Sequence, residues 1–385
     1  MRVRHKLAFL DGLRGLAALY VMVGHARSLL WEGFTQGFLQ HPQEYDLFNK
    51  GLVYFSVLFR YGVEAVFFFF VLSGFLIHLK YARLFQSDPS AKFGFSDYLM
   101  RRIKRIYPPF LFALLLTYGL DTLGASLGFW TPAFISGINK IASITTFLDV
   151  KTLFGNLAFL YFTYTPIFGS NGPAWSLKYE WWFYIIYPLV LLAARKKVMV
   201  ATVIIVFLFT LSFYPGLWPE ELSRDVFSLI VCWWLGVLLA EVYVGRISIP
   251  LKYISSLIGI LPFMPLIKDL PAPVYYTFFS LGVTGIIALC LFLQERKSSL
   301  RILERFALIG SFSFTLYMIH YPIFVFIRGW WQLNHNGALP MNFGLALAGI
   351  LCISILAYLV HFLTELPFLR SGRNPARVPL NGQIV

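Results

Sequence analysis

Arg14 and His25 have the side chains and the spacing of a site built into a membrane helix. They belong to an apolar stretch, residues 7–30, that also contains Asp11 one turn before Arg14. Because eleven residues make almost three helical turns, Arg14 and His25 share one face, roughly 16 Å apart along the axis. Ionisable groups inside a bilayer are costly and usually mark function. We therefore expect a site with two ends, a cation near one membrane surface and an imidazole deep in the core.

His25 is the candidate general base, because a neutral imidazole can take a proton from a hydroxyl near pH 7. Its imidazole needs an orienting group. Glu180, in Trp175-Ser-Leu-Lys-Tyr-Glu180, begins a later apolar run and could supply a carboxylate, as could Asp11. Glu180 could instead bind sugar hydroxyls, or could be an interfacial residue paired with Lys178. All these interpretations remain open at this point.

Three further side chains could line an acceptor site: Trp175, Glu64 and His320. Trp175, with the indoles at 181 and 182, could stack on a sugar ring, while Glu64 begins the second apolar run and His320 lies within the ninth. Each has a structural alternative, namely an aromatic belt, a charge at the membrane rim and a hydrogen-bonded core histidine. The pair Ser73-Gly74 is best explained as a packing notch between helices.

A basic cluster in the segment 101–105 could bind an anionic donor. The pattern predicts an interfacial helix from Ser96 that Pro108 and Pro109 stop, where the next span begins. Cations beside a helix N-terminus favour phosphate. Alternatively, the cluster only sets topology. If it binds phosphate, the cations at this end of the site are those of Arg101, Arg102, Arg105 and Arg14.

The composition requires most of the chain to lie in a membrane. Of the 385 residues, 58% are hydrophobic and 13% are charged, with a mean hydropathy of +0.70; soluble domains carry about 25% charged residues. We expect an all-α, polytopic helical bundle over residues 1–370 and a basic, poorly ordered cytoplasmic tail over 371–385. Ten spans are expected at 7–30, 52–79, 107–127, 177–194, 198–214, 226–244, 250–267, 273–293, 307–329 and 342–365.

The distribution of basic residues predicts the orientation. With the N-terminus in the cytoplasm, most of the 32 Lys and Arg residues fall in cytoplasmic segments, so both termini are expected inside. The net charge of +14 then needs no nucleic acid, and membrane lipids surround the bundle. Residues 129–174 do not fit simple spans, because an even number of crossings is needed there and two full helices barely fit. We expect them to form a re-entrant or outward-facing segment that walls an acceptor site.

The ordered motifs of this chain resemble those of the membrane acyltransferase-3 family. The usual Glu-Glu or Glu-Gln of one motif appears here as Tyr179-Glu180, so only one carboxylate is carried over. The resemblance covers essentially the whole chain, and does not extend to the hydrolase-like domain that is fused to some relatives. The matching segments, in order, are Leu10–His25, Phe67–Ile77, Arg102–Arg105 with Pro108, Trp175–Glu180, Tyr317–Pro322 and Glu365–Pro367.

This resemblance implies transfer of an acyl group, usually acetyl, from cytosolic acyl-CoA to a hydroxyl of an extracytoplasmic or lipid-linked carbohydrate. It implies an enzyme of a bacterial inner membrane, with no metal. Arg102 and Arg105 would hold CoA, and His25 would act as base or carry the acyl group. Two other functions remain open from the residues alone: a secondary transporter, which would need paired repeats that the chain lacks, and a non-catalytic component of polysaccharide assembly.

Overall fold

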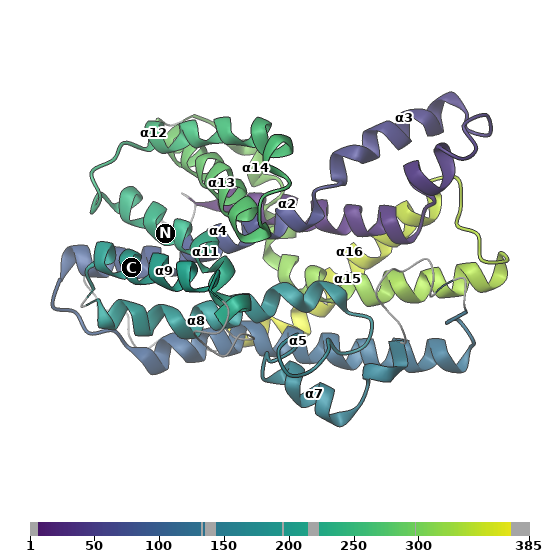
Figure 1. Ribbon diagram of the computed structural model, residues 1–385, viewed down its shortest axis with the longest axis horizontal. Coiled ribbons are helices and arrows are strands. Elements are labelled where there is room, and N and C mark those ends of the chain that lie inside the picture. Colours follow the sequence, from purple (N-terminus) through teal and green to yellow (C-terminus); the bar gives the residue numbers. More distant parts are fainter. Residues whose placement is uncertain are drawn as a thin grey trace.

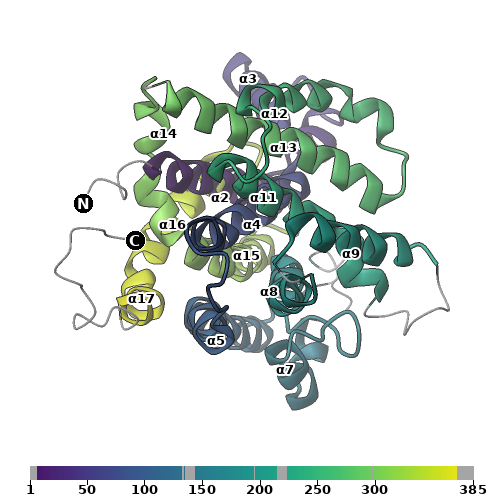
Figure 2. The same ribbon diagram turned by 90° about the vertical axis from the view of Figure 1, so that its left-hand side faces the viewer.

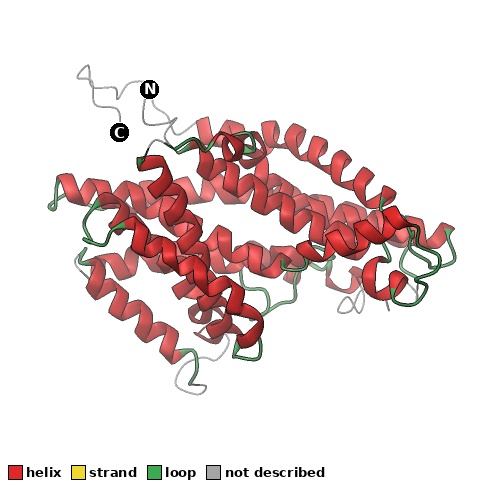
Figure 3. Ribbon diagram, turned by 90° about the horizontal axis from the view of Figure 1, so that it is seen from above, coloured by secondary structure: helices red, strands yellow, loops and turns green. Residues whose placement is uncertain are grey.

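The computed structural model describes residues 7–131, 134, 144–194, 196–214, 223–296 and 298–370. These residues form helices and loops without a strand (Figure 3). The predicted tail, 371–385, lies outside them. The helices are α2 (Ala8–Leu29), α3 (Leu47–Ser56), α4 (Gly62–Ser87), α5 (Phe95–Ser126), α7 (Val150–Leu157), α8 (Trp175–Ala193), α9 (Val198–Leu211), α11 (Ser228–Val244), α12 (Leu251–Ser255), α13 (Ala272–Glu295), α14 (Arg301–Glu304), α15 (Ala307–Asn334), α16 (Gly344–Thr364) and α17 (Leu366–Arg370).

The helix that carries Arg14 and His25 lies in the middle of the bundle. The long helices run roughly along the longest axis of the molecule (Figure 1). Seen from one end, α2, α4, α11 and α15 form the centre, with α12 to α14 above them, α5 below, and α8 and α9 on one side (Figure 2). α2 packs along α15 and α4, and α4 packs along α11. Residues on α2 can therefore meet side chains from several other helices.

The apolar runs predicted the positions of the helices well. Each of the ten expected segments overlaps one of the helices above, but the expected span 52–79 is interrupted: α3 ends at Ser56 and α4 begins at Gly62. In the described residues, six helices are long and apolar enough to cross a membrane: Gly62–Ser87, Phe95–Ser126, Asp225–Val244, Ala272–Glu295, Ala307–Asn334 and Gly344–Thr364. The chain is thus a polytopic helical membrane protein, but a count of ten spans is not confirmed.

The remaining four segments fall short for physical reasons. α2 carries Asp11, Arg14, His25 and Arg27, which lower its hydropathy, and α8 begins with the polar motif around Glu180. α9 has 14 residues, a length of about 21 Å against a hydrocarbon core of about 30 Å. α12 has 5 residues and continues as a 3₁₀ helix, η6 (Ser256–Ile267), which contains two prolines.

The expected break between an interfacial helix and the third span is wrong. α5 is one helix of 32 residues that passes through Pro108 and Pro109, and it begins after Gly94 without a side-chain cap from Ser96. A proline removes one backbone donor, but neighbouring helices in a membrane bundle can compensate for that loss. The arginines of the basic cluster therefore lie within α5, one turn before its prolines, and not in front of a new helix N-terminus.

The segment 129–174 contains no long helix in its described part. It holds η3 (Ile144–Phe147), α7 and η4 (Gly172–Ala174), joined by loops; residues 132–133 and 135–143 lie outside the described chain. Asp149 caps α7 by accepting hydrogen bonds from the hydroxyl and the backbone N–H of Thr152, at 2.6 and 2.9 Å, and these bonds lower the pKa of its carboxyl group. The described part thus holds only short elements where two full helices were expected barely to fit, and the re-entrant or outward-facing placement stays a prediction.

Glycines let the central helices approach closely. A Cβ atom added at Gly310 on α15 would lie 1.9 Å from the carbonyl oxygen of Asp11 on α2. A Cβ atom at Gly74 on α4 would lie 2.1 Å from the carbonyl oxygen of Trp233 on α11. Both contacts are with backbone, which cannot move aside as a flexible side chain can. The predicted packing role is confirmed for Gly74, whereas Ser73 has a different role, described below.

Gly310→Ala is expected to separate α2 from α15 and destabilise the bundle. Overpacking at such a crossing costs about 1–3 kcal/mol. Thermal unfolding of the purified protein in detergent measures this effect. The matched control is Gly119→Ala on α5, where an added Cβ would have no neighbour within 4 Å. If Gly310→Ala unfolded at the same temperature as Gly119→Ala, the close approach of α2 and α15 would be refuted.

Candidate active site

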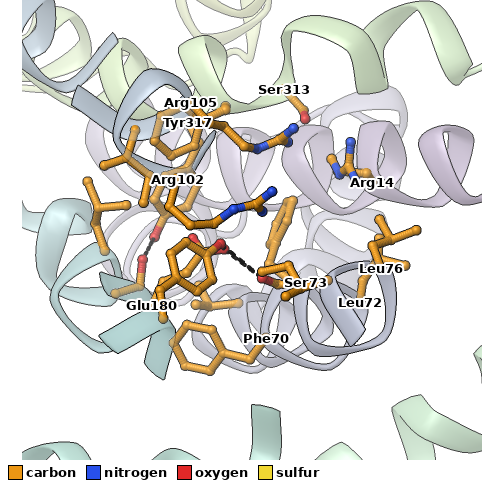
Figure 4. A pocket seen from close by; sticks show the side chains of 18 residues that line it. Arg14, Phe70, Leu72, Ser73, Leu76, Arg102, Arg105, Glu180, Ser313 and Tyr317 are labelled. Atoms are coloured by element: carbon orange, nitrogen blue, oxygen red, sulfur yellow. Dashed lines mark hydrogen bonds between the residues drawn. The ribbon is translucent and has the colours of Figure 1, made fainter. Parts of the chain in front are cut away.

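Three arginines from two helices surround one cavity of about 220 Å³, here called the arginine cavity. Arg14 enters it from α2, and Arg102 and Arg105 enter it from α5 (Figure 4). The predicted convergence of these three residues is therefore present in the structure. Arg101 does not line the cavity and instead donates to the hydroxyl of Tyr81 at 3.0 Å. The other lining side chains are mostly apolar, and include Val66, Phe69, Phe70, Leu72, Leu76, Ile77, Ile106, Leu177 and Phe314.

The guanidinium of Arg102 packs between two tyrosine rings, and one of its N–H donors has no hydrogen-bond partner in the described residues. It packs against the rings of Tyr98 and Tyr184, at 5.9 and 5.6 Å from their centroids. Its Nε atom is buried and has no hydrogen-bond partner in the described part of the chain. A buried donor without a partner is costly. Because the Arg102 side chain also lines the cavity, a ligand there could accept hydrogen bonds from its guanidinium.

Arg14 forms an ion pair with Asp11 at one edge of the cavity. The Nη1 atom of Arg14 lies 3.1 Å from Oδ1 of Asp11. The side chain of Asp11 is 53% exposed, against 16% for Arg14. The carboxylate of the pair is therefore at the surface of the bundle, and the guanidinium is mostly inside it. Asp11 is thus engaged with Arg14 and does not orient His25, contrary to one of the expectations above.

Glu180 also has partners other than His25. Its carboxylate accepts a hydrogen bond from Ser73 on α4 at 2.9 Å and one from Tyr184. Glu180 lines the arginine cavity together with Ser73, and so contributes one negative charge beside three positive ones. The expected roles of Glu180 in orienting His25 and in pairing with Lys178 are both wrong. Its place on the wall of the arginine cavity was not foreseen.

His25 meets His320 of α15. Its Nδ1 atom lies 2.8 Å from Nε2 of His320, and the rings are stacked with centroids 5.1 Å apart. The edge of Tyr321 packs on His25 at 5.0 Å. His320 is 1% exposed, while His25 remains partly accessible. Of the two interpretations of His320, contact with substrate and a hydrogen-bonded core histidine, its burial and its bond to His25 support the second.

A proline in α15 ties this histidine pair to the segment before α8. Pro322 has no N–H, so the carbonyl of Met318, four residues earlier, loses its helical donor. The side chain of Asn171 donates to that carbonyl at 2.9 Å. Tyr317 donates from its hydroxyl to the carbonyl of Pro173, also at 2.9 Å. The segment 171–173 is therefore fixed against the turn of α15 that carries His320.

Tyr317 lies between the arginine cavity and the histidine pair. It lines the cavity, and its ring centroid is 5.8 Å from that of His320. His25 itself is not a lining residue of that cavity. The structure thus has two adjoining regions on the side of α2 that faces α15, the arginine cavity and the histidine pair. Beside them, the hydroxyls of Tyr317 and Ser176 are hydrogen-bonded at 2.9 Å.

The tryptophans that were expected to bind sugar have other contacts. Trp181 stacks on Phe159 with centroids 5.0 Å apart, and Trp182 donates to the carbonyl of Phe159 at 3.0 Å. Trp175 packs edge-on against Tyr179. Lys178, fully buried, donates to Thr163 and Asp225 at 2.6 and 2.7 Å. These contacts fix the loop before η4 to α8.

Glu64, in the first turn of α4, contacts a different helix from the histidine pair. It accepts a hydrogen bond from Tyr275 of α13 at 3.2 Å, whereas His25 contacts α15. Its expected contact with substrate has no support from these partners. Glu64 instead links the beginning of α4 to α13.

Two buried polar clusters were missed by the sequence analysis. His78 of α4 contacts Glu241 of α11 at 2.6 Å, and Glu241 also pairs with Arg246 at 3.0 Å. Arg328 of α15 is 2% exposed and donates to Gln332 at 3.1 Å. Both clusters had a signal in the sequence, because ionisable residues inside apolar runs are rare and usually have a partner.

The comparison with known protein families identifies most of the chain. The model of one family, described as an acyltransferase domain and designated acyltransferase-3, matches residues 7–359. This range contains the arginine cavity, the histidine pair and all but the end of the membrane domain. No curated protein and no solved structure matches the chain significantly.

Proposed function

The chain belongs to the acyltransferase-3 family of membrane acyltransferases, and from this premise we propose that it is an O-acyltransferase. It transfers an acyl group, most simply acetyl, from cytosolic acyl-CoA to a hydroxyl group of an extracytoplasmic or lipid-linked carbohydrate. The observation that carries the proposal is that one helix, α2, brings Arg14 to the arginine cavity and His25 to the neighbouring histidine pair.

The arginine cavity suits the thioester donor. Acyl-CoA combines phosphates and amide and thioester carbonyls with an apolar acyl group. Arg14, Arg102 and Arg105 offer cationic donors, and the remaining wall is largely apolar. Arginine binds phosphate and carbonyl oxygens well because its guanidinium is a fixed fork of donors. We assign the donor to this cavity, with Arg102 and Arg105 as its main anchors.

The positions of the basic residues support the orientation. Arg14 lies near the beginning of α2, which follows three basic residues, and α5 follows a segment with several more. Under the positive-inside rule, this end of the bundle faces the cytoplasm, where acyl-CoA is found. His25 then lies further towards the outer leaflet of a bacterial inner membrane. Both termini are cytoplasmic in this topology.

His25 acts as the general base on the acceptor. Its Nε2 atom takes the proton from the carbohydrate hydroxyl while the hydroxyl oxygen forms a bond to the acyl carbon. The bond between that carbon and sulfur breaks, and the thiolate that leaves takes up a proton. The separation of Arg14 and His25 covers about half of a 30 Å hydrocarbon core. The acyl end of the donor therefore passes Tyr317 to reach His25.

Mass spectrometry of cell-surface glycans tests the proposed acceptor. We expect glycans from the wild-type host to carry an acyl ester that is absent from a strain lacking this protein. Mild alkali should remove the added mass, because it hydrolyses esters, and a plasmid copy of the gene should restore it. Identical glycan masses in the two strains would contradict the assignment of a carbohydrate acceptor.

A further inference from the structure

The histidine pair has a defined pattern of donors and acceptors. The Nδ1 atom of His320 lies 3.0 Å from the carbonyl oxygen of Leu316, one turn earlier on α15. A carbonyl oxygen can only accept, so this nitrogen must carry the hydrogen. In a neutral imidazole the other nitrogen then has the lone pair. The Nε2 atom of His320 is therefore an acceptor.

The same logic assigns the hydrogen on His25. Since Nε2 of His320 accepts, Nδ1 of His25, at 2.8 Å, must donate. The lone pair of neutral His25 then lies on Nε2, the nitrogen that the pair leaves free. This is the form that a general base needs. The chain from Leu316 through His320 thus selects one tautomer of His25.

The surroundings of the pair also fix the orientation of the rings. Tyr321 packs its edge on His25 at 5.0 Å, and Phe324 packs against His320 with centroids 6.0 Å apart. The turn that carries His320 is tied to the segment 171–173 through Asn171, as described above. An imidazole on this support has little freedom to rotate, so the bond between the two histidines is preorganised.

We propose that His320 is the positioning residue of His25, which rests on the proposed function of His25 as the general base. His320 directs Nε2 of His25 towards the acceptor hydroxyl. When His25 takes up the proton, its Nδ1–H bond to His320 becomes charge-assisted and therefore stronger. A neutral imidazole does this work here in place of the carboxylate of a Ser-His-Asp triad.

Two substitutions of His320 separate the loss of its hydrogen-bond acceptor, Nε2, from a change of packing. His320→Leu removes the acceptor, while His320→Gln can place an amide oxygen near the former Nε2. In the full-length enzyme, with acetyl-CoA and glycan from the host as substrates, we expect His320→Leu to lower kcat about 10–100-fold. KM for acetyl-CoA should stay within about twofold of the wild-type value, because the arginine cavity is intact. His320→Gln should recover most of kcat, and His335→Leu, at the far end of α15, serves as the control.

Nitrogen-15 NMR of histidine-labelled protein reads the tautomer directly. In the wild type, we expect a protonated Nδ1 and an unprotonated Nε2 on His25, assigned by difference from His25→Asn. In His320→Leu this single form should become a mixture. A lone pair on Nδ1 in the wild type, full activity of His320→Leu, or equal loss in the Gln and Leu variants would each overturn the proposal. If the wild type transferred no acyl group but showed the expected tautomer, the proposed function would fail while the assignment of the pair survived.

Discussion

His25→Ala is expected to lower kcat for acyl transfer by about 10²–10⁴-fold, the usual contribution of a positioned general base. In the proposed mechanism the loss follows from the removal of Nε2, which would take the proton of the acceptor hydroxyl. KM for acetyl-CoA should change little, because His25 does not line the arginine cavity. The measurement is steady-state transfer from acetyl-CoA to host glycan by the purified, full-length enzyme in detergent.

The control for this variant is His335→Ala. His335 directly follows α15, at the end far from His320. His335 stacks on Trp331 at 3.9 Å and contacts neither α2 nor the cavity residues in the described structure. It should retain wild-type kinetics. If His25→Ala kept its kcat, or if its whole loss lay in KM, then His25 would not be the base, and the histidine pair would serve another purpose.

Arg105→Ala is expected to raise KM for acetyl-CoA about 10–100-fold, as the loss of a charge-assisted hydrogen bond to an anionic ligand predicts. Arg102→Ala should act in the same direction and should also free the space between Tyr98 and Tyr184. The two effects should not add, because both side chains line one cavity. At saturating acetyl-CoA, each variant should retain more of its activity than His25→Ala does.

Arg83→Ala on α4 removes the same charge from an exposed position outside the cavity. It separates specific binding from a general loss of positive potential. An unchanged KM in this control and a raised KM in Arg105→Ala would support a donor site at the cavity. Equal shifts in both variants would indicate only long-range attraction, and an unchanged KM in Arg105→Ala would refute phosphate binding there.

The helices could be predicted from the sequence because apolar runs of this length have few alternatives in a membrane. The extent of each helix was less certain. Pro108 and Pro109 predict the end of a helix, yet α5 continues through both. Whether a proline ends a helix depends on whether other groups satisfy the carbonyls that it frees. Those groups come from the tertiary structure, as with Asn171 and the carbonyl before Pro322.

The components of the site could be predicted, but not their pairing. Arg14, Arg102 and Arg105 were expected at one end, and they share a cavity. The partner of His25 was expected to be an acid, whereas it is His320, 295 positions away in the chain. Helical periodicity places residues on a face of their own helix, and the neighbour of that face depends on how the helices cross. Gly310, which brings α15 against α2, is part of that crossing.

The partner of Glu180 could not be predicted from the sequence either. A carboxylate near the beginning of α8 could have met several partners, and its sequence neighbour Lys178 was an obvious one. Residues two apart lie on different faces of a helix, and the structure gives these two side chains different partners. Lys178 turns to Asp225, and Glu180 turns to Ser73. The buried pair of His78 and Glu241 could have been proposed from the rarity of such residues in apolar runs.

Transfer of label across the membrane tests the central claim most directly. Inside-out vesicles from the host receive [¹⁴C]acetyl-CoA on their exposed cytoplasmic face, and alkali-labile label is then counted in the carbohydrate fraction. The account predicts label in vesicles that contain the wild-type protein and almost none in vesicles that contain equal amounts of His25→Ala. Equal labelling of carbohydrate with the two proteins, or none with the wild type, would contradict it.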